Sequence, residues 1–120
     1  MTLNKDFMGA MISWLCMVHC LAGPVLITLG ISTAGLSLLE NESVHLFLVA
    51  PILLFVAWSI PSGLRRHHHP IPAIAAIVGI SLLFLGLFNE ALELPLTVGA
   101  SSMLIFAHLF NRKLIIGVRK

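Results

Sequence analysis

Four long stretches of this chain contain no acidic or basic side chain, and they limit what the chain can fold into. The stretches cover residues 7–39, 43–64, 67–89 and 94–111. A helix needs about 20 apolar residues to cross the ~30 Å hydrocarbon core of a bilayer. Each stretch therefore has room for one membrane-spanning helix.

The composition supports a lipid environment. Hydrophobic residues make up 58% of the 120 residues and charged residues 10%, whereas a soluble domain carries roughly 25% charged residues. A chain this short has too little interior to hide so much apolar surface from water, so the bilayer is its expected partner. The net charge of +2 gives no support to binding of nucleic acid.

Apolar residues run continuously through these stretches instead of alternating, which favours helices over the strands of a barrel. The predicted fold is all-α: an integral membrane four-helix transmembrane bundle, formed by a single domain over residues 1–120. The spans are expected at about 7–29, 43–60, 72–88 and 95–112, with ends that sequence patterns place only to within a few residues.

Charge is distributed unevenly between the two sides of this predicted bundle. All seven Lys and Arg residues precede span one, lie between spans two and three, or follow span four. The positive-inside rule places that side, and with it both termini, in the cytoplasm. Four of the five acidic residues fall on the opposite side: Glu40, Glu42, Glu90 and Glu93.

Cys16, His19 and Cys20 form the first candidate site. Residues three and four apart share one face of a helix, so two thiols and an imidazole are expected close together near the middle of the membrane. Thiolate and imidazole are ligands for soft and borderline metals such as Hg²⁺, Zn²⁺ and Cu⁺. The plainer interpretation is that the cysteines pack as small apolar residues. Pro24 leaves the Cys20 carbonyl without its helical partner and predicts a kink nearby.

Histidines in two other spans extend this pattern. His45 opens span two on the outer side, and His108 lies in span four toward the cytoplasm. If both face inward, they and the first span form a ladder of metal ligands, and several moderate sites let an ion both enter and leave. His45 is equally well interpreted as an interfacial residue that touches water.

Polar residues at the cytoplasmic side complete the candidate set. Asn111 lies one turn after His108 and is expected to orient its ring, as hydrogen-bonding partners of metal ligands do. His67, His68 and His69 follow span two at the cytoplasmic surface. A solvated loop is one interpretation of this triplet, and a metal acceptor is the other.

Several segments resemble the MerC-like membrane proteins. Residues 14–24, Trp-Leu-Cys-Met-Val-His-Cys-Leu-Ala-Gly-Pro, are similar to the first-helix motif of that family. The Val-His opening of span two, the Arg-Arg-His segment before span three and the Ala-His-Leu-Phe-Asn-Arg end of span four are similar as well, in the same order. The resemblance implies a four-helix bundle in the bacterial inner (plasma) membrane with both termini inside.

The resemblance also implies a function, namely carriage of mercuric ion to a cytoplasmic reductase by cysteines of the first helix. Carried over, that role falls on Cys16 and Cys20. His19 stands between these thiols and departs from the mercury members. A mixed His/Cys set suits Zn²⁺ or another borderline metal better than Hg²⁺.

The leading hypothesis is a transporter, not an enzyme, that moves Hg²⁺ or Zn²⁺ toward the cytoplasm, with a homodimer as the expected assembly. The alternative is a b-type haem protein for electron transfer, with His19 and His108 as axial ligands. A thiol oxidoreductase is disfavoured because its cysteines belong in a Cys-x-x-Cys pair or near the surface. A purely structural subunit leaves the intramembrane histidines unexplained.

Overall fold

Four helices make up almost all of the structure, a computed structural model that describes residues 2–31 and 42–119. The helices are α1 (Thr2–Thr28), α2 (Glu42–His67), α3 (Ile71–Leu87) and α4 (Glu93–Val118), and a short 3₁₀ turn, η2 (Glu90–Leu92), precedes α4. Within the described residues there is no strand. The predicted all-α four-helix bundle is confirmed.

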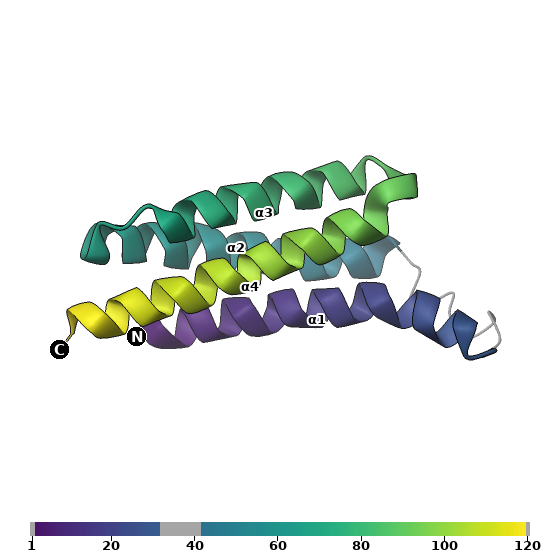
Figure 1. Ribbon diagram of the computed structural model, residues 1–120, viewed down its shortest axis with the longest axis horizontal. Helices are drawn as coiled ribbons and strands as arrows, with labels where there is room; N and C mark the ends of the chain where they lie inside the picture. The colour runs from purple at the N-terminus through teal and green to yellow at the C-terminus, as the bar shows by residue number, and fades with distance from the viewer. Residues whose placement is uncertain (1, 32–41, 120) are drawn as a thin grey trace.

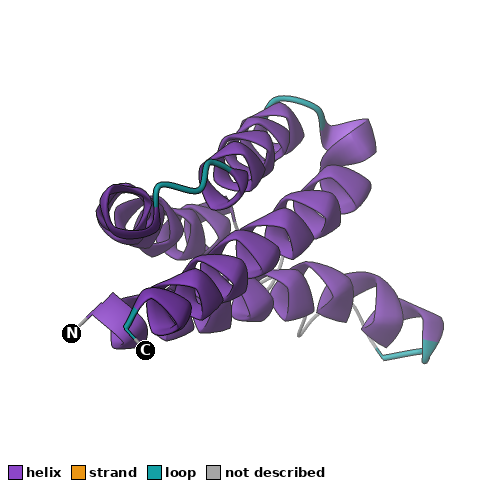
Figure 2. Cartoon of the chain, turned by 60° about the vertical axis from the view of Figure 1, so that its left-hand side comes forward, coloured by secondary structure: helices purple, strands orange, loops and turns teal. Residues whose placement is uncertain are grey.

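The helices form an elongated bundle with both termini at one end (Figure 1). The connection between α2 and α3 lies at that same end, and η2 lies at the other. The view in Figure 2 again shows the two termini close together. The long dimension is 52 Å, enough for the ~40–45 Å of a bilayer with its headgroups.

Three helices are longer than the predicted spans at the end that holds the termini. By length and composition alone, Asn4–Thr28, Leu46–His67 and Glu90–Val118 are able to cross a membrane, and Ile71–Leu87 is a shorter apolar helix. The extra turns bring residues that were expected at span boundaries, Asp6 among them, inside the helical bundle. Glu40 lies outside the described residues.

Helix α4 contacts each of the other three helices, and small residues permit the close approach. A Cβ atom added to Gly79 of α3 would lie 2.8 Å from Cγ of Leu104 and 3.2 Å from the Ala100 carbonyl oxygen. Lipid does not drive apolar helices together, so membrane bundles depend on such close packing. The main core cluster includes Cys16, Ile52 and Leu104.

Candidate metal centre and buried polar network

The two cysteines lie together on the inner face of α1. Cys16 is fully buried in the bundle core, Cys20 packs partly buried against the same core cluster, and their thiol groups share a hydrogen bond. Both are free cysteines, not a disulfide. Glu93, at the start of α4, is close enough to interact electrostatically with Cys20. A reduced thiol pair inside an apolar bundle can bind a soft cation once it loses its protons.

The other members of the predicted ladder are distributed differently. His19 is partly exposed, and among the residues that the structure describes no group of three or more His, Cys, Asp and Glu side chains is placed to hold one metal ion. The thiols are thus brought together as a pair, without His19 as a third member of such a group. His45 lies in the first turns of α2, and its side chain is outside the described part. Helix α1 continues through Pro24 and bends near its C-terminal end (Figure 1).

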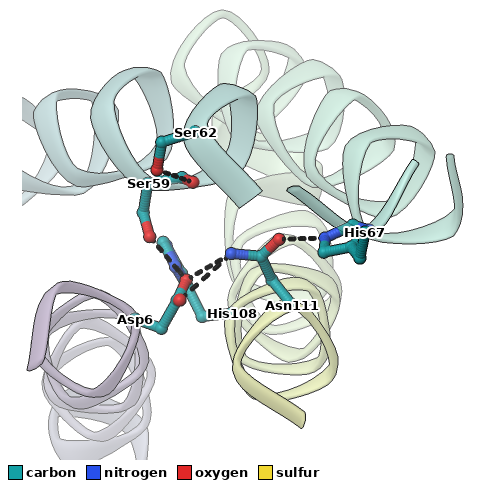
Figure 3. Close-up of polar contacts among 6 residues, drawn as sticks. All are labelled: Asp6, Ser59, Ser62, His67, His108 and Asn111. Atoms are coloured by element: carbon teal, nitrogen blue, oxygen red, sulfur yellow. Dashed lines mark hydrogen bonds and ion pairs between the residues drawn. The ribbon is translucent and has the colours of Figure 1, made fainter. Parts of the chain in front are cut away.

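A buried carboxylate that sequence reasoning missed organises the end of the bundle near the termini (Figure 3). Asp6 of α1 is fully buried and accepts hydrogen bonds from two other helices. Ser59 Oγ of α2 lies 2.6 Å from Asp6 Oδ1. Asn111 Nδ2 of α4 lies 2.9 Å from Oδ1 and 3.0 Å from Oδ2, and His108 Nδ1 lies 3.3 Å from Oδ1. One side chain therefore ties three helices together.

The hydrogen bonds around Asn111 run in one consistent direction. The backbone N–H of His69 donates to Nδ1 of His67 at 3.0 Å, which leaves the proton of a neutral His67 ring on Nε2. Nε2 then donates to Asn111 Oδ1 at 2.8 Å, and the Asn111 amide donates to Asp6. His67 is thus connected to the buried carboxylate, whereas His68 and His69 are exposed.

Two glycines make room for the ring and the amide of this network. A Cβ added to Gly9 of α1 would lie 2.5 Å from His108 Nε2 and 2.8 Å from its Cδ2. A Cβ added to Gly63 of α2 would collide with the side-chain amide of Asn111. Real Cβ atoms essentially never lie this close to another heavy atom, so neither glycine can be replaced unless a neighbouring group moves. The network is therefore fitted closely against the α1 and α2 backbones.

Asn111 does not orient His108 in the way that was expected. Because Asn111 lies one turn after His108, a direct hydrogen bond between the two side chains was expected. In the structure, the His108 ring and the Asn111 amide each contact Asp6 instead. The polar atoms of Asp6, Ser59 and Asn111 all have partners. Nε2 of His108 is buried and without a hydrogen-bond partner in the structure.

Comparison with known protein families matches residues 6–113 to the MerC mercury resistance protein family. The chain belongs to the MerC family. The match includes the cysteine pair of α1, the buried Asp6 network and α4 as far as residue 113. No match was found among curated proteins or among solved structures. Membership and the apolar helices make this MerC protein a multi-pass membrane protein connected with mercury resistance.

The MerC bundle also fixes the separation of the predicted site residues along α1. His108 packs against Gly9, seven residues before Cys16 and ten before His19. At a rise of 1.5 Å per residue these separations are about 10 Å and about 15 Å along the helix axis. His19 and His108 are therefore at different levels of the bundle, whereas the two axial ligands of a haem lie at one level, on either side of the iron.

Proposed function

We propose that this MerC protein carries a soft cation, Hg²⁺ in the first place, across the bacterial inner membrane toward the cytoplasm, held between Cys16 and Cys20. The observation that carries the proposal is the pair of free thiols in contact on the inner face of a membrane-crossing helix. The match to a mercury resistance family supports the same cation.

The arrangement of ligands favours Hg²⁺ over Zn²⁺ at this position. Structural zinc sites are almost always four-coordinate, whereas the described residues offer the thiols as a pair and no larger group of metal ligands around them. Thiolates are soft ligands and select soft metals. On binding, both thiols lose their protons and two S–Hg bonds form. The two thiolate charges then cancel the charge of the divalent ion, so the loaded site is electrically neutral.

Charge at the two ends supports an inward direction. Glu90 and Glu93 lie at the end that holds η2, and Glu93 interacts electrostatically with Cys20. Acidic side chains at an entrance raise the local cation concentration. Basic residues of α2 and α4, with Lys5 of α1, gather at the opposite end, which the positive-inside rule assigns to the cytoplasm.

Binding of Hg²⁺ to the purified full-length protein tests the proposal. Wild type is expected to bind one ion per chain with release of two protons, and Cys16→Ser with Cys20→Ser is expected to abolish binding. Met17→Leu is the matched control, because the Met17 sulfur is a thioether on the same helix that accepts a weak contact from Ser102. Unchanged stoichiometry in the double cysteine variant would overturn the proposal.

Uptake into proteoliposomes separates transport from simple binding. Vesicles that contain a trapped small thiol are expected to accumulate Hg²⁺ through wild-type protein and through Met17→Leu. The double cysteine variant is expected to admit no more than protein-free vesicles. Equal uptake by the variant and wild type would show that the thiol pair is not on the route.

A further inference from the structure

A pocket lies between the first turns of α1 and the C-terminal part of α4, at the end of the bundle that holds the termini. It has a volume of about 420 Å³ and is lined by Asn4, Phe7, Met8 and Arg112. Pockets that bind small ligands typically have volumes of ~300–1,000 Å³. The three α1 residues are exposed, so the pocket is open toward the surroundings of the bundle.

The cation in this pocket has no anion beside it. Arg112 is half-buried, and its Nε atom is buried without a hydrogen-bond partner. The guanidinium carbon lies 5.8 Å from the centroid of the Phe7 ring. Asp6, the acidic residue at this end of the bundle, forms its ion pair with His108 instead. Within the described part of the chain Arg112 therefore has no acidic partner, and its guanidinium is available to bind an anion from outside.

An apolar face of α1 continues from the pocket toward the middle of the membrane. Asn4, Met8, Met11 and Leu15 follow one another at spacings of three and four residues, so they share one face of the helix. The two methionines are each 46% exposed and Leu15 is 50% exposed. From Asn4 to Leu15 the helix rises about 16 Å, which is roughly half of the ~30 Å hydrocarbon core. The face is thus about as long as one leaflet is deep.

These features fit an anionic phospholipid better than a soluble anion. The phosphate of a phospholipid carries negative charge, and arginine is well suited to bind phosphate oxygens. The acyl chains of the same molecule cover the apolar face that continues from the pocket. A free phosphate would contact Arg112 and leave Phe7 and Met8 uncovered. Basic pockets between transmembrane helices bind anionic headgroups in other membrane proteins.

We propose that this pocket binds the headgroup of an anionic phospholipid. Arg112 and Asn4 hold the phosphate, and one acyl chain lies along Met8, Met11 and Leu15. The neighbouring Lys113 is exposed and does not line the pocket, so the headgroup is assigned to one particular cation and not to the basic surface as a whole. The site uses neither thiol of the cysteine pair, and its existence does not depend on the proposed transport.

Native mass spectrometry of the full-length protein, released from a neutral detergent, tests the site with phosphatidylglycerol and phosphatidylcholine of identical acyl chains. Wild type is expected to bind its first phosphatidylglycerol about fivefold more tightly, the effect of one basic residue at an anionic lipid surface. Arg112→Gln should lose this preference, and the matched control Lys113→Gln should keep it. Equal affinity for the two lipids in wild type, or equal losses in the two variants, would overturn the inference.

Two measurements on wild type locate the lipid without any substitution. Phosphatidylglycerol with a photoreactive diazirine in one acyl chain should cross-link mainly to residues 8–15 of α1. Glycerophosphoglycerol, the same headgroup without acyl chains, should fail to displace the lipid at an equal concentration. Cross-links spread evenly over the four helices would indicate unspecific lipid contact, and displacement by the headgroup alone would indicate a site for a soluble phosphate ester. Either result would contradict the inference, and because no Hg²⁺ is used, neither bears on the thiol site.

Discussion

Nδ1 of His108 lies 3.3 Å from Oδ1 of Asp6, and both side chains are completely buried although they are 102 residues apart in the chain. The contact joins the first turns of α1 to the second half of α4. It also leaves the opposite ring nitrogen of His108 unpartnered. The packing of three helices at the end that holds the termini thus depends on this one carboxylate.

Asp6→Ala should destabilise the bundle far more than a substitution that removes one of the side chains donating a hydrogen bond to the Asp6 carboxylate. An interhelical hydrogen bond in a membrane protein contributes about 0.6 kcal/mol on average, which is the loss expected for Ser59→Ala. Removing the carboxylate leaves three buried side chains short of an acceptor, and each such group costs about 1–3 kcal/mol. Unfolding in bicelles measures the difference, with Ser62→Ala as the control. A cost for Asp6→Ala no larger than that of the control would contradict the structure.

Gly9→Ala and Gly23→Ala form a matched pair on α1. A methyl group on Gly9 meets the buried His108 ring, whereas one on Gly23 meets nothing within 4 Å. Overpacking of this kind costs about 1–3 kcal/mol, and alanine is otherwise the better helix former by up to about 1 kcal/mol. Gly9→Ala should therefore lower stability and shift the His108 ring resonances, and Gly23→Ala should do neither. Equal effects would show that His108 does not pack on Gly9.

Asn111→Asp places a second carboxylate beside Asp6 in a nearly isosteric change. Two acidic groups about 3 Å apart inside a membrane repel each other, and the donor to Asp6 is lost. The cost should exceed the about 1–3 kcal/mol of one buried unpaired polar group. Asn4→Asp, an exposed change on the same end of α1, should cost little in the same unfolding assay. Tolerance of Asn111→Asp would show that the amide is not needed as a donor.

Single reporter cysteines test the orientation in the membrane. In the Cys16→Ser, Cys20→Ser background, Asn89→Cys lies at the η2 end and Gly117→Cys near the C-terminus, and both positions are exposed. A membrane-impermeant maleimide added to intact spheroplasts should label Asn89→Cys and spare Gly117→Cys until the cells are opened. The reverse pattern would place the basic end outside and reverse the proposed direction of transport.

Much of the fold was predictable from where charges are absent. Four charge-free stretches correspond to the four helices, and the free cysteine pair on one face of α1 follows from a spacing of four residues. Asp6 was missed because it lies next to Lys5, one residue before the predicted start of the first span, where an acidic residue looks like an ordinary boundary. The helix instead begins at Thr2, so Asp6 is inside it.

A signal for Asp6 was nevertheless present in the sequence. Asp6, Ser13 and Cys20 are spaced seven residues apart, which places them on one stripe of a helix together with Cys16. The partners of Asp6 were beyond the reach of a single sequence, because Ser59, His108 and Asn111 meet only when the helices pack. The gap between Cys16 and His108 likewise depends on the register of α1 against α4, which no local pattern contains.

X-ray absorption at the mercury edge, on protein loaded with one equivalent of Hg²⁺, tests the central claim most directly. Wild type and Met17→Leu should both show two sulfur neighbours around the metal. Cys20→Ser should lose one of them, and Cys16→Ser with Cys20→Ser should retain no mercury. A sulfur count below two in wild type, or a spectrum that neither cysteine substitution changes, would contradict the claim that Cys16 and Cys20 hold the cation between them.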